Sequence, residues 1–329
     1  MKTPELIDIL PGIELPVREV TDHLAAMWET DATDVPTEFR ASQMNVVLHF
    51  GTSVGPEDAR ERFDSLIRFA QRYPSRIIVL CPGHAKGGGS MSAKLFSQCY
   101  IGDSHREMCC CEALLLRYEP EDFGYLSNQV SVWLEADLPT YHWFSEVPAH
   151  RMQTYFHTLL KGVRRCVYDS SLGLEALESL NWPEPDRVYD LAKARLLPIR
   201  QSIGQFLSGY SAEQLSMGLE SIRVVYSTKM WGEGFRLMQW AQDCFSDYVR
   251  LLSDESAIKT DLITRPDSQS GCLLSLEFEY NDARFFKWQL LDDNARGVID
   301  SNLGQQVEHV PIQIQALTAE QALAEALFF

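Results

Sequence analysis

The stretch MNVVLHFGTSVGPEDARERFDSLIRFAQRYPSRIIVLCP, residues 44–82, decides the expected fold. It opens with an apolar run over 44–51 and closes with another over 75–82, and both are typical of buried strands. Between them Pro56 suits a first helical position, and apolar side chains follow at helical spacing, at Ala59, Phe63, Leu66, Ile67 and Ala70. Such a strand–helix–strand unit with short connections forms a parallel crossover. The stretch therefore predicts an α/β fold.

The alternation of expected strands and helices continues to about residue 180, and a different order of elements follows. Strands are expected at 92–101, 108–116, 139–144 and 164–171, and helices at 122–136 and 151–162. The proline-containing stretch LNWPEPDRV, 180–188, resembles a linker. We expect an α/β N-terminal domain over 1–180 with a mainly parallel or mixed sheet, followed by an α+β C-terminal domain over 181–329. In the second part, helices are expected at 186–207, 232–252 and 318–329, with strands at 220–227, 258–264, 272–280, 284–290 and 306–315.

Composition narrows the class of protein. The chain has 329 residues of which 45% are hydrophobic, enough for a sizeable core. The net charge of −17 is spread evenly over both halves, which argues against a nucleic-acid partner. The first residues contain prolines and acids, and no eighteen apolar residues run together, so neither export nor a membrane span is expected. Eight cysteines without a regular framework suit a reducing compartment, and a cytoplasmic protein is expected.

Three consecutive cysteines, Cys109, Cys110 and Cys111, lie within an apolar run that predicts a strand. In a strand Cys109 and Cys111 share one face while Cys110 points to the other, so the three cannot close round one metal ion. The chain also lacks a C-x-x-C pair, and no metal site is predicted. Core packing is the favoured interpretation. A redox role stays open and would need another cysteine on a neighbouring strand, such as Cys81, Cys99 or Cys166.

The turn after the first strand matches the G-x-S-x-G pattern of hydrolases, with Ser53 as the candidate nucleophile. In that motif the helix begins directly after the serine. Here Pro56 fits the first helical position, with Gly55 as the cap. An ordinary strand-to-helix turn is favoured, and a serine hydrolase using Ser53 remains the alternative.

Three histidines, His142, His150 and His157, lie close together in the sequence. No carboxylate stands between them at metal-ligand spacing. We therefore expect surface histidines rather than a metal site.

The segment DRVYDLAKARLLPIRQSIGQFL, 186–207, carries one apolar stripe at helical spacing. Arg195 falls on the edge of that stripe, where a cation must find a carboxylate, a ligand or a protein partner. Pro198 removes a backbone hydrogen bond and should kink the helix beside Arg195. An internal ion pair and a functional contact are both open for this arginine.

This last segment resembles the D-L-x-W-x-R-L-x-P-W-R-E helix of the OpcA family, the glucose-6-phosphate dehydrogenase assembly proteins. Upstream, RASQMNVVLHF, YPSRIIVL, REMCCCEALLL, SVWLEADLPTYHWF and RRCVYDSS are similar to that family's successive N-terminal blocks, in the same order. The resemblance covers residues 40 to 207. Lys193 and Ile199 stand where the family usually has tryptophans, and Gln201 replaces an acid, so the surface that those groups build differs here.

The resemblance implies a non-catalytic accessory protein without a cofactor. It would bind glucose-6-phosphate dehydrogenase and favour the active oligomer of that enzyme, with a link to redox state in photosynthetic relatives. The family pattern carries Cys110 with Glu112 in the C-C-E block. It also implies partner-binding roles for four residues of the later segment, Asp190, Arg195, Pro198 and Arg200.

Overall fold

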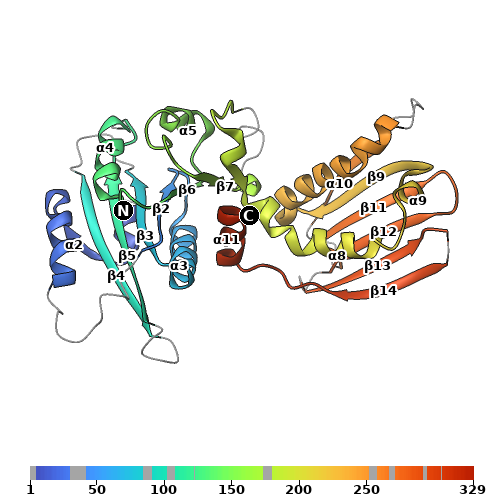
Figure 1. The fold of residues 1–329 in the computed structure, drawn as a ribbon, viewed down its shortest axis with the longest axis horizontal. Helices are drawn as coiled ribbons and strands as arrows, with labels where there is room; N and C mark the ends of the chain where they lie inside the picture. The colour runs from blue at the N-terminus through green and yellow to red at the C-terminus, as the bar shows by residue number, and fades with distance from the viewer. Residues whose placement is uncertain are drawn as a thin grey trace. The chain divides into compact units, whose positions relative to one another are not determined.

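The computed structural model describes residues 5–29, 42–83, 91–101, 108–121, 123–172, 180–251, 258–266, 271–291, 295–304 and 306–329. The chain divides into two compact units (Figure 1). The first unit takes its described residues from Met1–Asp169, Gly173–Asp190 and Ala319–Phe329, and the second from Ser170–Leu172 and Leu191–Thr318. The domain boundary expected at residue 180 stays a prediction, because these units follow a different division and return the C-terminal helix to the first unit.

The first unit is built on a mixed sheet of eight strands in the order β1-β4-β5-β3-β2-β6-β7-β8. The strands from β5 to β8 in this order pair in parallel, whereas β4 is antiparallel to β5 and β1 to β4. The chain runs from β2 outward to β5 and then returns to β6 on the other side of β2. The α/β fold with a mixed sheet is therefore confirmed. The strands are β1 (Ile13–Leu15), β2 (Met44–Phe50), β3 (Ser75–Pro82), β4 (Ser92–Ile101), β5 (Met108–Tyr118), β6 (Thr140–Ser145), β7 (Arg165–Tyr168) and β8 (Val188–Asp190).

Helices cover both faces of this sheet. On one face α2 (Val20–Glu29), α4 (Phe123–Trp133) and α5 (Ala149–Tyr155) enclose a core that includes Val47 and Phe144 of the strands. The short α1 (Leu6–Ile9) packs with α3 (Pro56–Arg72). Helix α3 lies on the opposite face, where Phe63 contacts the ring of Phe96. Every strand between β5 and β6 is thus buried on both sides, as the unbroken apolar runs require.

The C-terminal helix α11 (Ala319–Phe328) packs against α3 in the first unit. The ring of Phe328 lies 4.9–6.0 Å from the rings of Phe69, Tyr73 and Tyr141. Arg68 and Glu320 form an ion pair at 3.3 Å between the two helices. The last helix therefore packs on a helix far from it in the chain, since Arg68 and Glu320 are 252 residues apart.

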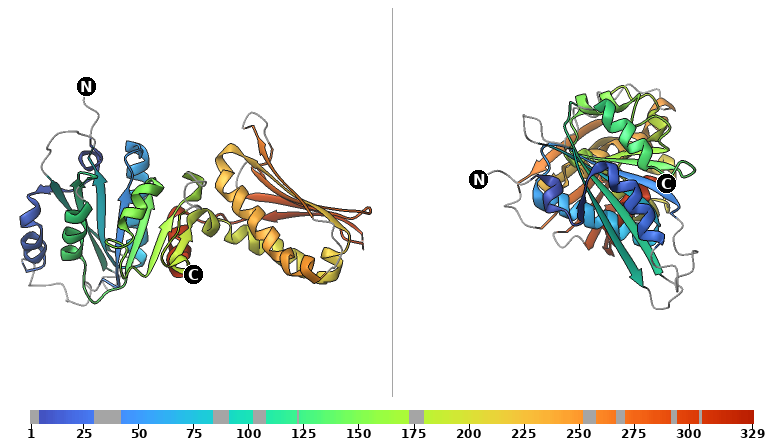
Figure 2. Two further views of the ribbon diagram at one scale, coloured as in Figure 1. Left: turned by 90° about the horizontal axis from the view of Figure 1, so that it is seen from above. Right: turned by 90° about the vertical axis from the view of Figure 1, so that its left-hand side faces the viewer.

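The second unit has a six-stranded sheet in the order β10-β9-β11-β12-β13-β14. Strands β9 and β11 to β14 form the expected antiparallel meander, and β10 adds a parallel edge. Helices α8 (Leu197–Leu207) and α10 (Trp231–Leu251) pack on one face, over Trp288 and Leu276 (Figures 1 and 2). The strands are β9 (Leu219–Ser227), β10 (Lys259–Arg265), β11 (Leu274–Tyr280), β12 (Phe285–Leu290), β13 (Arg296–Asn302) and β14 (Val307–Gln313). The sequence did not predict β13.

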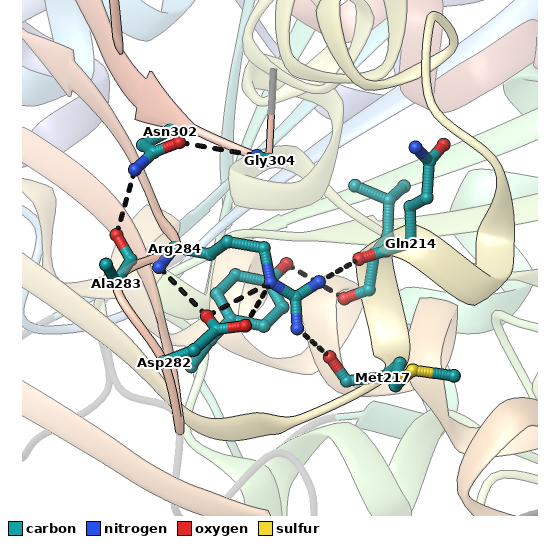
Figure 3. Close-up of polar contacts among 9 residues, drawn as sticks. Gln214, Met217, Asp282, Ala283, Arg284, Asn302 and Gly304 are labelled. Atoms are coloured by element: carbon teal, nitrogen blue, oxygen red, sulfur yellow. Dashed lines mark hydrogen bonds and ion pairs between the residues drawn. The ribbon is translucent and has the colours of Figure 1, made fainter. Parts of the chain in front are cut away.

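Arg284 ties the turn between β11 and β12 to the chain after helix α9 (Ala212–Ser216) (Figure 3). Its guanidinium donates to the carbonyl oxygens of Gln214 at 2.9 Å and Met217 at 2.6 Å. It also pairs with the Asp282 carboxylate at 2.9 Å and lies 4.6 Å from the centre of the Tyr280 ring. These contacts satisfy carbonyls at the end of a helix, where no backbone donor is left.

The helix predicted over 186–207 is wrong in its first half. The chain forms a turn of 3-10 helix, Pro185–Arg187, then strand β8, then the short helix α7 (Leu191–Arg195) and α8. Strand β8 forms because Val188–Asp190 pair with Cys166–Tyr168 of β7, a partner that local periodicity cannot reveal. Pro198 lies in the first turn of α8, where a missing N–H costs no hydrogen bond, so the expected kink is a break between two helices at Leu196.

Candidate functional site

Four polar aromatic side chains meet inside the first unit, near the carboxyl ends of its parallel strands. His142 Nε2 on β6 lies 3.3 Å from His49 Nδ1 on β2, and His49 Nε2 lies 2.6 Å from the hydroxyl of Tyr118 on β5. Tyr155 on α5 lies beside Tyr118, and its ring packs on the ring of His49 with 4.9 Å between the ring centres. All four residues are buried. We call this set the His–Tyr chain.

The fold explains how these residues meet. Strands β2 and β6 are parallel neighbours at the point where the strand order reverses, with His49 opposite Phe144 and Val47 opposite His142. Alternation places both histidines on the face that α5 covers. The prediction that His142 lies at the surface is wrong, because β6 is covered on both faces and its side chain is 1% exposed. His150 and His157 are exposed, as expected.

Burial keeps His49 and His142 neutral. It lowers the pKa of His142 to about 3. The pKa of His49 is lowered well below its ordinary value by burial and then by the neighbouring His142. Burial likewise raises the pKa of Tyr118 and of Tyr155. At neutral pH the four side chains therefore form an uncharged set, in which hydrogen bonds join His142, His49 and Tyr118.

Tyr118 and Tyr155 line a cleft of about 560 Å³ at the carboxyl edge of the sheet. Open α/β sheets hold their ligands at this edge, beside the point where the strand order reverses. Loops after β2, β3, β5 and β6 supply the walls. The lining residues are Phe50, Gly51, Thr52, Pro82, Gly83, Tyr118, Glu119, Pro120, Glu121, Val147, Pro148, His150, Arg151 and Tyr155.

Charges of both signs stand in the walls of this cleft. Arg151 donates to the carbonyl of Pro120 at 3.0 Å and to the carboxylate of Glu121 at 3.3 Å. Glu119 pairs at 2.8 Å with Arg117, which stands just behind it on β5. The carboxylates and the guanidinium thus offer acceptors beside donors, with no surplus of positive charge.

The turn after β2 is closed by the loop after β6. A side chain at Gly51 would place its Cβ 1.9 Å from the carbonyl oxygen of Glu146. The Gly51 N–H donates to the Ser145 carbonyl at 2.7 Å, and Arg62 binds both the Ser145 hydroxyl and the Glu146 carboxylate. Gly51 is therefore required by the close approach of two backbones rather than by catalysis.

Ser53 lies in this turn and is exposed. Its hydroxyl donates to the Glu146 carbonyl at 3.5 Å. Helix α3 begins at Pro56 with Gly55 as its N-cap. The chain therefore makes the ordinary strand-to-helix turn and not the sharp strand–serine–helix elbow that a hydrolase of this motif needs.

Arg195, at the end of α7, makes an ion pair inside the second unit. Its Nε lies 2.5 Å from Glu233 Oε1 on α10, and its Nη2 donates to Ser171 Oγ at 3.3 Å. The Glu233 side chain is 6% exposed and that of Arg195 is 28% exposed. Of the alternatives that the sequence left open, the internal ion pair is the one present.

The other residues with an expected partner-binding role lie in different elements. Asp190 ends β8 and is buried in the first unit, whereas Pro198 and Arg200 belong to α8 of the second unit. The guanidinium of Arg200 reaches the carbonyl of Lys193 at 3.5 Å. Their partner-binding role stays a prediction.

The strand predicted for the three cysteines is confirmed by β5. Cys111 is buried, and its Sγ lies 3.5 Å from the carbonyl of Gln98. The side chains of Cys109 and Cys110 lie outside the described residues, so their packing and redox role stay predictions. In the strand register Cys110 faces Cys99 of β4.

Two further observations concern metal ions and membranes. Within the described ranges, no group of three or more histidine, cysteine, aspartate or glutamate side chains is arranged to hold a metal ion. In the same part of the chain, no helix has the length and apolar character needed to cross a membrane.

Comparison with known proteins points to one family. Residues 67–181 match the family described as the glucose-6-phosphate dehydrogenase subunit N-terminal domain, OpcA. A "Putative OxPP cycle protein OpcA" from Synechococcus elongatus is 31% identical over 103 residues, which are 31% of this chain and 23% of the length of that protein. The solved structure of KijD10, a 3-ketoreductase from Actinomadura kijaniata, shares 8% identity at a TM-score of 0.42, covering 86% of this chain and 88% of its own. The resemblance read from the sequence is confirmed over residues 67–181, where this chain is similar to the N-terminal domain of the OpcA family.

Proposed function

We propose that this chain is a non-catalytic accessory protein that binds glucose-6-phosphate dehydrogenase and promotes its active oligomeric form in the oxidative pentose phosphate pathway. The observation that carries the proposal is the family match over residues 67–181. The name of the Synechococcus relative supports the same pathway. The matched segment contains strands β3 to β7 of the first sheet.

The geometry at Ser53 supports an accessory role over the hydrolase alternative. A nucleophilic serine needs a neighbouring base and donors for the oxyanion at a sharp elbow. Here Ser53 lies three residues before the helix and donates to a backbone carbonyl. We further propose that the protein acts in the cytoplasm and that its partner is a protein and not a nucleic acid.

The residues for which we propose a role in partner binding are Asp190 of the first unit and, in the second unit, Arg195, Pro198 and Arg200. Arg195 can take part in partner binding in spite of its internal pair, because 28% of its side chain remains accessible. Glu233 holds the guanidinium in one place, so a partner carboxylate would meet a fixed donor. Arg200 lies on the next helix along the chain.

The test uses the full chain and the dehydrogenase of the same cell. Addition of the chain should raise the activity of the enzyme and shift its mass by light scattering to a larger oligomer that contains both proteins. Heat-denatured chain is the control. If neither activity nor mass changed at micromolar concentrations, the accessory function would be refuted.

A second comparison tests the partner-binding residues and the alternative. Arg200→Ala should weaken binding, whereas Arg187→Ala should not, because Arg187 is a surface arginine outside the proposed set, with 48% of its side chain exposed. An ester hydrolysis by the wild-type chain that disappeared in Ser53→Ala would replace the accessory function by the hydrolase.

A further inference from the structure

The His–Tyr chain has a direction. His49 and His142 are neutral, so each ring carries one N–H and each hydrogen bond of the chain has a single donor. At the buried end, His142 Nδ1 has no hydrogen-bond partner among the described residues. A buried N–H without an acceptor is rarer than an unused acceptor. The proton of His142 therefore belongs on Nε2, from which it points to His49.

The remaining donors then point toward the cleft. His49 Nε2–H donates to the Tyr118 hydroxyl over 2.6 Å, so the O–H of Tyr118 is left to donate elsewhere. Tyr118 is one of the residues that line the cleft. The two buried histidines thus fix a hydroxyl donor at the cleft wall.

The rest of the wall suits hydroxyl groups. The guanidinium of Arg151 stands as a donor near the carboxylates of Glu119 and Glu121, which accept. A ligand hydroxyl both donates and accepts, so it can use a carboxylate and a guanidinium or phenol at once. Phe50 and Pro148 contribute apolar surface for the carbon face of such a ligand.

We propose that this cleft is a binding site for a small uncharged polyhydroxyl ligand, a sugar or a sugar-bearing molecule such as a nucleoside. Its volume of about 560 Å³ lies within the range of small-molecule sites. The proposal goes beyond the accessory function and does not depend on it, because the test below involves no dehydrogenase.

An uncharged ligand fits better than a phosphorylated one. Apart from the imidazole of His150, the charged side chains among the described lining residues are the carboxylates of Glu119 and Glu121 and the guanidinium of Arg151, which already pairs with Glu121. A phosphate would face both carboxylates, and like charges at short range are unfavourable. The turn after β2, where related folds bind phosphates, is closed by the backbone of Glu146 against Gly51.

The experiment uses the full chain with nitrogen-labelled histidine. The imidazole nitrogen signals of His49 and His142 are followed by NMR during titration with D-ribose, D-glucose and adenosine, and separately with adenosine monophosphate and inorganic phosphate. At least one uncharged probe should shift these signals in a saturable way, because a ligand that bonds to the last hydroxyl of the His–Tyr chain changes the hydrogen bonds of both histidines. Tyr118→Phe should weaken that binding about three- to tenfold, the effect of one lost hydrogen bond.

The matched control is Tyr125→Phe, which removes a hydroxyl from the exposed face of α4 and should leave binding unchanged. If Tyr118→Phe does not fold, Glu121→Ala replaces it, because 73% of the Glu121 side chain is exposed. The proposal is overturned if no uncharged probe gives a saturable shift at about 20 mM, a weak limit for such ligands. Binding of adenosine monophosphate or phosphate alone would overturn it too, and so would equal binding by the wild type and the cleft variant.

Discussion

The ion pair between Arg195 and Glu233 can be tested by a double-mutant cycle. Arg195→Met removes the charge and keeps most of the side-chain volume, while Glu233→Gln removes the carboxylate charge with little change of shape. The Glu233 side chain is 6% exposed, and Nε and Oε1 are 2.5 Å apart. Breaking a buried pair by removing one partner costs about 3–5 kcal/mol, since a charge is left in the interior.

The expected cost here is smaller, because solvent reaches 28% of the Arg195 side chain and screens part of the interaction. We expect Arg195→Met to lower the free energy of unfolding by about 2–3 kcal/mol. The double variant should lose about 1–2 kcal/mol less than the sum of the two single variants. A cycle isolates the pair because each substitution removes the same interaction.

The assay is urea unfolding of the full chain followed by circular dichroism and by tryptophan fluorescence, with light-scattering measurement of dehydrogenase binding beside it. Arg187→Met is the control, since its ion pair is exposed and worth about 0–1 kcal/mol. Strictly additive single variants would refute the pair as a stabilising contact. Unchanged stability with lost enzyme binding would instead assign Arg195 to the partner surface alone.

Three further predictions concern the first sheet and the Arg284 corner. The unfolded pKa of histidine, near 6.5, exceeds the folded pKa of His142, about 3, so the unfolded state binds the extra proton between these values. Stability due to neutral His142 is therefore full above pH 6.5 and falls by about 1.4 kcal/mol per pH unit below it, and urea titrations from pH 7 to pH 5 should show a flatter decline in His142→Phe. Gly51→Ala should cost several kcal/mol, about 3 or more, or yield no soluble protein, because its Cβ would overlap the Glu146 carbonyl; a melting temperature equal to that of the wild type would contradict the close approach. Arg284→Met should lower the free energy of unfolding by about 2 kcal/mol through the lost bonds to Gln214 and Met217, and Arg284→Lys should recover little of it, since a lysine cannot reproduce the fork.

The parts of the fold that depend on neighbouring residues could be predicted from the sequence. The stretch 44–82 forms β2, α3 and β3 with Pro56 at the helix start, as its pattern requires. The parts that depend on distant partners could not. Strand β8 is three residues long and exists because β7 lies beside it, and α11 returns to α3 from the far end of the chain. No local pattern encodes such a contact.

The polar residues of the candidate site could not be predicted either, because their burial also depends on residues that are distant in the sequence. A polar residue on a strand that is covered on both faces looks, in the sequence, like one on a half-exposed strand. The surface position expected for His142 followed from the lack of a neighbouring carboxylate and took no account of how its strand is covered. His49 gave no signal, although the apolar run around it is unbroken. The missing information is the identity of the covering helices. A polar side chain inside a run that lacks period-two alternation is therefore a stronger sign of a buried site than the G-x-S-x-G motif beside it.

The first sheet combines two features that bear on how an α/β fold can act as an accessory protein. Its strand order reverses between β2 and β6, the arrangement that opens a ligand crevice at the carboxyl edge. At the same edge the loop after β6 lies against Gly51 and closes the turn where such folds hold phosphates. What remains open is a cleft displaced toward β5 and α5, with the His–Tyr chain beneath it. Burying two neutral histidines costs stability unless their hydrogen bonds are met, and three of their four ring nitrogens have partners. The His–Tyr chain carries this cost in stability and ends in a tyrosine hydroxyl at the cleft wall. Its presence therefore supports a binding role for the cleft.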